Sequence, residues 1–496
     1  MKTLLKTTAL LCVAFLLLNS CDEKKKDDKK KDAETTKIKA EAEVNYDLAE
    51  ADTSASTCDC ETTWFPHTQT PAPAEGANSP FAASSTTNCI FHQWSWQKFL
   101  WLTVPDTNKT PLFLRDASIK QVDPFMNPVT IPSGATLALS ITEEQQAGSL
   151  GILRSNPNFN SGNSETVYYA IYMNDTMNEA ALTYASQIAD GTLDHNNAQA
   201  FPVGSFELKT SWIPTTAIPQ ADLPNYYTTN ANIDGVTTEV ALLGMHVVGV
   251  VENHPEFIWA TFEHNNLAPA FDWTKGTAST DTDKLLFKAG SVSTIDGIQW
   301  PYGGAAPTLE SEAYTLFKNG VPRISGSDPK TNFMATSQSE PQNFNNIESI
   351  DSCVAKNLTD VWNNYAYTGS IWINTDGLTP TEQTALINSL GSGIGAATPG
   401  SSARGSLNSA NISMETYTQT FMPSLSSIAA DNLTNCFSCH SAQSFTKQGT
   451  PQYKSPLYIS HVFNGYLEQE KGATKDEINQ MKVQDFQNTF FNKEKK

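Results

Sequence analysis

The chain has 496 residues, a formal net charge of −20 and 39% hydrophobic residues, among them ten tryptophans and 24 phenylalanines. This acidic balance argues against a nucleic-acid partner, and it fits a soluble acidic surface or docking to a basic partner. The length and aromatic content are sufficient for two or more domains with a sizeable core.

Residues 1–20 have the organisation of a lipoprotein signal peptide. Lys2 and Lys6 provide a positive start, and the apolar stretch 9–18 is too short to cross a bilayer as a helix. The stretch ends in Leu-Asn-Ser-Cys, which resembles a bacterial lipobox and predicts cleavage before Cys21 with a lipid on that residue. The alternative is an ordinary signal peptide followed by a chance cysteine.

Residues 21–56 begin with alternating runs of lysine and aspartate and predict a charged, disordered tether. A charged run behind a lipidated cysteine resembles the surface-export signals of some Bacteroidota lipoproteins, whereas Asp22 suggests inner-membrane retention by the enterobacterial rule. We expect attachment to a membrane of the cell envelope, namely the outer membrane, on its periplasmic face or at the cell surface.

Residues 57–390 predict a β-rich globular domain with helices. The aromatic stretch 91–102 indicates a buried helix, with an exposed ligand platform as the alternative. A helix opening at Thr379 is indicated by Pro380 at its first position and Glu382 closing a capping box. Strands are predicted at 165–173, 205–213, 240–251, 256–262 and 367–373, and a further helix at 352–365.

Three of the eight histidines, His246, His254 and His264, fall within one short part of this domain. They could form a metal site or face a haem, and His246 would then be the first candidate for a distal acid–base group. The alternative is structural, with a satisfied core His246, a turn residue and a strand-end residue.

Residues 391–406 are rich in Gly, Ser and Ala and predict a linker, followed by a helical region over 407–496. A helix over 422–435 leads into the motif, and Thr474 with Glu477 opens the last helix.

Cys436, Cys439 and His440 form a Cys-x-x-Cys-His sequence, the attachment signature of one covalent c-type haem. Two thiols one helical turn apart reach the two vinyl groups of a porphyrin, and the adjacent imidazole becomes the proximal iron ligand. The alternative is half of a zinc site, but the chain has no second Cys-x-x-Cys. The distal ligand is left open between His461 and Met414, other Met or His residues, or an open position.

Four cysteines remain when the signal, the lipid and the haem are accounted for. They are Cys58, Cys60, Cys89 and Cys353, and an even number in an oxidising compartment indicates two disulfides. A bond between Cys58 and Cys60 would be strained, so we expect one of them to join Cys89 and the other Cys353.

The chain also resembles a family of exported bacterial proteins known simply as the cytochrome c family, which are large and mostly monohaem. The matching stretches are 91–102, 206–212, 244–248, 256–264, 411–416 and 435–441. The resemblance implies haem binding and electron transfer without a settled substrate. Few residues follow His440, so we expect the haem to pack partly against the large N-terminal region.

The sequence thus predicts an α+β protein, with a large β-rich N-terminal region carrying helices and a small helical haem c region at the C-terminus. The favoured function is a membrane-anchored cytochrome that transfers electrons to a redox partner protein. The alternatives are a haem enzyme of peroxidase or oxygenase type with an open distal site, and a ligand-binding surface lipoprotein with an ancillary haem. No motif of a nonhaem enzyme is present.

Overall fold

The computed structural model describes residues 58–140, 153–194, 199–269, 343–389, 402–406, 411–414, 436–445 and 453–481, and short pieces between 271 and 334. These residues belong to one compact unit, Ala55–Lys496. The predicted signal, the lipidation site at Cys21, the tether and the helix over 422–435 lie outside the described residues. Among the helices that are described, none is both long and apolar enough to cross a membrane.

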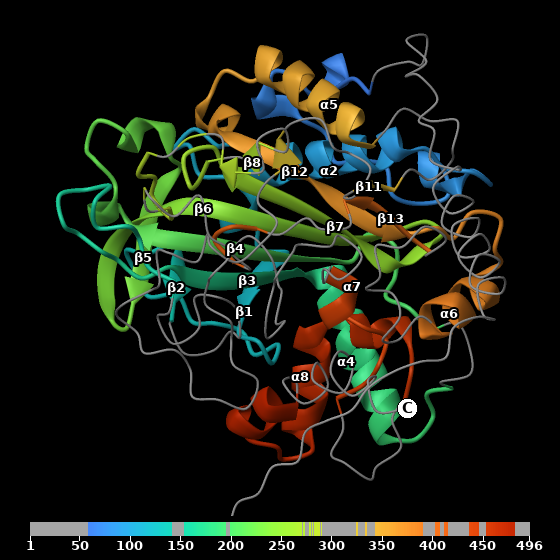
Figure 1. Cartoon of the computed structure of the whole chain (residues 1–496). Coiled ribbons are helices and arrows are strands. Elements are labelled where there is room, and N and C mark those ends of the chain that lie inside the picture. Colours follow the sequence, from blue (N-terminus) through green and yellow to red (C-terminus); the bar gives the residue numbers. More distant parts are fainter. Residues whose placement is uncertain are drawn as a thin grey trace, which may run out of the picture. The chain divides into compact units, whose positions relative to one another are not determined.

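A ten-stranded sheet organises this unit (Figure 1). Its main path runs β1-β3-β4-β6-β7-β12-β13-β11, and every neighbouring pair on the path is antiparallel. The strands on this path are β1 Ile119–Val122, β3 Tyr168–Asn174, β4 Phe206–Pro214, β6 Val236–Val251, β7 His254–His264, β11 Phe333–Met334, β12 Tyr365–Ile373 and β13 Ala403–Ser406.

Two further strands extend the sheet beside β6. Strand β5 (Thr228–Ile233) is antiparallel to β6, and β2 (Leu137–Leu139) is parallel to β5. Strand β6 begins four residues before the predicted start at Val240. Its first residues are not buried in the core, but they form backbone pairs with β5. A separate small sheet contains β8 Phe271–Asp272, β9 Thr277–Ala278 and β10 Ile324–Ser325.

Helices cover both faces of the large sheet, so the molecule is an α+β protein as predicted (Figure 1). We call the side that carries α2 (Asn88–Thr103) and α5 (Asn343–Asn357) the first face. The second face carries α4 (Asp175–Ala189), α6 (Pro380–Ser389), α7 (Cys436–Cys439) and α8 (His461–Glu470). The short helix α3 (Leu112–Arg115) packs beside α2 and β1.

Aromatic packing closes the first face. Phe91 stacks on Trp372 with ring centroids 3.9 Å apart, and Phe99 stacks on Phe262 at 4.1 Å. Because Trp94, Phe91 and Phe99 are buried, the aromatic stretch is core rather than an exposed ligand platform, and the buried-helix prediction is confirmed.

Two disulfides tie the start of the described chain to this face. Cys58 joins Cys89 at the start of α2, and Cys60 joins Cys353 in α5. Each of the two closely spaced cysteines therefore bonds to a different distant partner. The sequence did not determine which of Cys58 and Cys60 bonds to Cys89 and which to Cys353.

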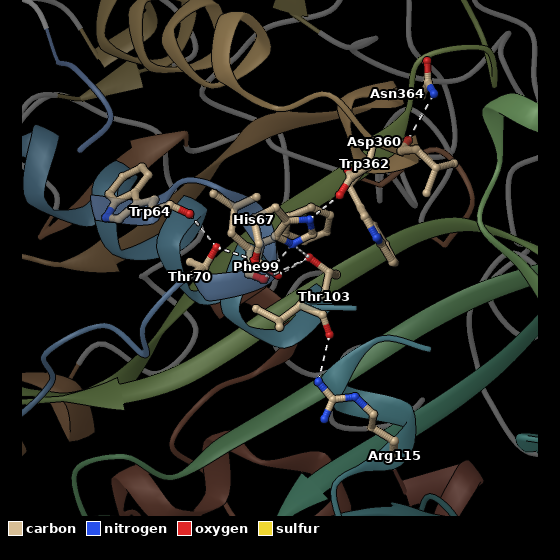
Figure 2. Close-up of polar contacts among 12 residues, drawn as sticks. Trp64, His67, Thr70, Phe99, Thr103, Arg115, Asp360, Trp362 and Asn364 are labelled. Carbon is tan, nitrogen blue, oxygen red and sulfur yellow. Dashed lines mark hydrogen bonds and ion pairs between the residues drawn. The ribbon is translucent and has the colours of Figure 1, made fainter. Parts of the chain in front are cut away.

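His67 fixes the same segment through both ring nitrogens (Figure 2). Nδ1 lies 2.6 Å from Asp360 Oδ2, and Nε2 lies 3.0 Å from Leu100 O and 3.1 Å from Thr103 Oγ1. An Asp-His-hydroxyl set is also the pattern of an activated nucleophile. Here the Thr103 hydroxyl is fully buried and donates to Phe99 O at 2.7 Å, so the cluster is structural.

The predicted linker over 391–406 is wrong at its end, because Ala403–Ser406 forms strand β13 against β12. Gly405 has φ +87°, and a Cβ there would lie 2.2 Å from Ser370 O. The glycine therefore permits a close approach of two backbones instead of a flexible connection. The rest of the predicted linker, apart from Ser402, lies outside the described residues.

No domain boundary separates the described C-terminal residues from the sheet, contrary to the predicted division at 391–406. Phe437, Leu457 and Phe463 share one hydrophobic cluster with Val248 and Trp259 of the central strands. Residues far apart in the sequence form one core here, which a change in composition cannot reveal. The predicted helix over 352–365 also differs, because α5 ends at Asn357 and a 3-10 turn follows at Val361–Asn364, capped by Asp360.

Candidate functional site

The Cys-x-x-Cys-His sequence lies on the second face. Helix α7 consists of one turn, Cys436–Cys439, and the backbone N–H of His440 donates to Cys436 O at 2.8 Å. Cys436 is buried and belongs to neither disulfide of the described chain. Positions three apart in a helix share one face, so the backbone places 436 and 439 as attachment to one porphyrin requires.

His440 is half-buried, and its ring is oriented by the chain beyond the motif. Nδ1 lies 3.0 Å from the carbonyl oxygen of Ile459, at the end of the 3-10 turn Pro456–Ile459. A carbonyl only accepts, so Nδ1 carries the proton and the lone pair of the neutral ring is on Nε2. Metal-binding histidines typically have this arrangement, because the second-shell carbonyl fixes the tautomer and the ring plane.

His461 is brought directly to His440. The two rings stack with centroids 3.8 Å apart and planes inclined by 23°, and Phe445 lies edge-on to His461 at 5.0 Å. His461 is the first residue of α8, whose N-cap Ser460 accepts from Phe463 N. Rings this close leave no space for a porphyrin between them, so His461 would have to turn away to bind the opposite side of an iron.

Met414, the other predicted distal candidate, lies elsewhere on the sheet. It is fully buried in a hydrophobic cluster with Ile412 and Leu243 that does not include Cys436. Asn411 and Ser413 hold this segment on Gly244, where a Cβ would lie 2.6 Å from the Asn411 amide. The structure therefore places His461, and not Met414, beside His440.

Trp259 of β7 completes the surroundings of His440 and was not singled out in the sequence. Its ring lies 4.2 Å from the His440 ring and meets Phe437 edge-on at 6.4 Å. The side chain is 7% exposed, and Nε1 has no hydrogen-bond partner among the described residues. The sequence does contain a signal that could have identified Trp259. Side chains alternate between the two faces of a strand, so Trp259 lies on the same face as Phe257, two residues earlier.

A row of polar residues crosses the sheet next to the row that contains Trp259. This polar row contains Lys209 in β4, His246 in β6 and Thr261 in β7, which are paired across the three neighbouring strands. The row with Trp259 lies two residues away along each strand and contains Glu207, Val248 and Trp259. His246 Nδ1 lies 3.0 Å from Thr261 Oγ1, and Lys209 Nζ lies 5.3 Å from the Tyr169 ring. Because residues two apart in a strand share a face, this row lies on the second face.

The other two clustered histidines have structural contacts. His254 is buried with Nδ1 2.9 Å from Glu256 Oε1, and its ring contacts Phe91 on the first face. His264 stacks on Tyr226 at 3.6 Å. The three histidines therefore do not converge, and no group of three His, Cys, Asp or Glu side chains that could hold a metal ion exists in the described part of the chain.

Tyr458, in the 3-10 turn that orients His440, has a shifted pKa. Burial raises the pKa of its phenol, so the side chain is neutral at physiological pH. It therefore adds no charge beside the motif.

Comparisons with known proteins give no family assignment. No protein-family model, no curated protein and no solved structure matches this chain. The argument for function therefore depends on the motif and its geometry.

Proposed function

We propose that this protein is a c-type cytochrome that carries one haem covalently attached at Cys436 and Cys439, with His440 as its proximal ligand. The observation that carries the proposal is the 3.0 Å contact between His440 Nδ1 and Ile459 O. It directs the lone pair to Nε2 and orients the ring from outside the motif, as a metal ligand requires. The zinc alternative has no comparable support, because the described residues include no group of three or more His, Cys, Asp or Glu side chains that could hold a metal ion.

The chemistry of the donor set fits a haem. Cys436 is buried against Phe437 and the sheet, outside either disulfide, and the motif backbone forms one helical turn. A bound haem would supply a one-electron couple. The chain would hold it on the second face of the sheet, against the central strands, with the helical residues after 436 as its cover, so the C-terminal region would act as a haem region docked on the β-rich region.

Electron transfer is the role that we favour over haem catalysis. His461 is adjacent to the proposed proximal histidine, so the chain has a second imidazole at the motif that would help to hold the iron of a bound haem and leave it without an open position for a substrate. His246, the candidate acid–base residue of the enzyme alternative, is engaged with Thr261 in the sheet. We further propose that a lipid on Cys21 anchors the protein in the cell envelope, where it meets a redox partner protein.

A visible spectrum of the mature protein tests the proposal. We expect a c-type α band on reduction and no prompt change with carbon monoxide. A carbon monoxide adduct on the wild-type protein would favour the enzyme alternative. Replacing Cys436 and Cys439 by Ser should remove haem that stays on the chain in a denaturing gel, whereas Ser438→Ala, inside the same motif, should retain it. Covalent haem in the double variant would contradict the attachment sites.

A further inference from the structure

The indole N–H of Trp259 is a buried donor that lacks an acceptor in the described chain. Buried donors in folded proteins are almost always paired, because an unpaired one loses its hydration without compensation. Its position is specific, since the same ring packs against His440. An acceptor supplied by a bound group would account for both observations.

The neighbouring row carries two further groups that can donate to an anion. Lys209 and His246 are opposite each other, and His246 is opposite Thr261, two positions from Trp259 on the same face. The carboxylates closest to these groups in the strand register already accept hydrogen bonds. Glu207 accepts from Ser460 Oγ, and Glu263 accepts from Ile412 N. This part of a strongly acidic protein thus combines a cation with an unpaired N–H donor.

A haem brings two propionate carboxylates, which are ionised and accept hydrogen bonds only. A carboxylate that leaves water requires charged or N–H donors, and those bonds are stronger than bonds between neutral groups. We propose that Trp259 Nε1, together with Lys209 and His246, binds the haem propionates on the second face of the sheet. This inference rests on the proposed haem attachment at Cys436 and Cys439.

The experiment compares haem-loaded full-length variants. Trp259→Phe keeps an aromatic ring against His440 and removes the N–H together with the pyrrole part of the indole, and Lys209→Met removes the cation while retaining an apolar stem. Both should retain covalent haem at the wild-type ratio. Both should lower the midpoint potential, because propionates with fewer donors stabilise the positive charge of oxidised iron. Resonance Raman spectra should show shifted propionate bending bands.

Lys120→Met is the matched control. Lys120 is half-exposed on strand β1, pairs with Asp175 at the start of α4 and lies four strands from Trp259 in the sheet order, so its loss should leave the potential and the propionate bands unchanged. Wild-type potential and bands in both Trp259→Phe and Lys209→Met, with haem attached, would overturn the propionate site and leave the proposed cytochrome intact. Absence of covalent haem from the wild-type protein would instead overturn the proposed function itself.

Discussion

The two faces of the sheet use histidine and aromatic residues differently. On the first face, His67 contacts acceptors through both nitrogens, and the aromatic rings stack on one another. On the second face, His440 is half-buried, is oriented through Nδ1 and lies between Trp259 and His461. This difference is why we assign stability to the first face and the proposed haem site to the second.

The sharpest test of this division removes one phenylalanine from each face. Phe99 and Phe463 are both fully buried, the first against Phe262 and the second against Phe201. Phe99→Ala and Phe463→Ala should each lower the free energy of unfolding by about 3–5 kcal/mol, measured by urea denaturation. Only Phe463→Ala should reduce the covalent haem content of the folded protein. An equal loss of haem in both variants would remove the functional distinction between the faces.

A smaller effect is expected where α8 meets the loop after β1. A Cβ at Gly465 would lie 2.7 Å from the carbonyl oxygen of Pro124 and 3.0 Å from the Phe125 ring. Gly465→Ala should therefore cost about 1–3 kcal/mol of stability by overpacking, with an accompanying loss of haem. Gly76→Ala, where nothing lies within 4 Å, is the control and should change the thermal midpoint little. Unchanged stability of Gly465→Ala would show that α8 is not tightly docked.

A pH-dependent effect is expected at a carboxyl on the first face. Asp351 accepts from Trp96 Nε1 at 2.7 Å, and burial raises its pKa well above the usual range. Below about pH 3.9, the pKa of an aspartate in the unfolded chain, Asp351 is protonated in both the folded and the unfolded protein, so it does not reduce the free energy of unfolding. As the pH rises above that value, the unfolded state ionises first, and stability falls until the folded pKa is passed.

Asp351→Asn should remove this fall while retaining an oxygen that accepts from Trp96. Relative to wild type, the variant should gain about 1.4 kcal/mol at neutral pH for each unit by which the native pKa is raised, and nothing near pH 3.5. Urea denaturation at both pH values measures this difference. A variant that is no more stable than wild type at pH 7.5 would show that the carboxylate is solvated there.

Local patterns predicted much of this fold. The capping box at Thr379 and Glu382 is present as expected, with Glu382 Oε2 accepting from Thr379 N at 2.8 Å, and the box at Thr474 and Glu477 has the same form. The aromatic helix and the long strand pair β6–β7 were also predicted, because apolar periodicity is a property of neighbouring residues. The Cys-x-x-Cys-His sequence, on which the proposed haem site depends, is a local pattern of the same kind.

Pairing between distant strands could not be predicted. Gly405 was interpreted as part of a linker because its role depends on Ser370, a residue of the partner strand. Trp259 was missed for a similar reason, since its contact with His440 joins two segments that only the sheet brings together. His461 and Met414 were equally ranked because spacing along the chain does not specify which one lies beside the motif.

The Cys60–Cys353 bond also bears on the timing of assembly. Ribosomes deliver the chain from its N-terminus, so Cys58, Cys60 and Cys89 are all present long before Cys353 is made. Cys60 must therefore remain reduced, or release a mistaken bond to Cys89, until nearly all strands of the large sheet have been synthesised. The Cys60–Cys353 crosslink thus closes only after residue 353 has been made, and a product truncated before that residue lacks the partner thiol of Cys60.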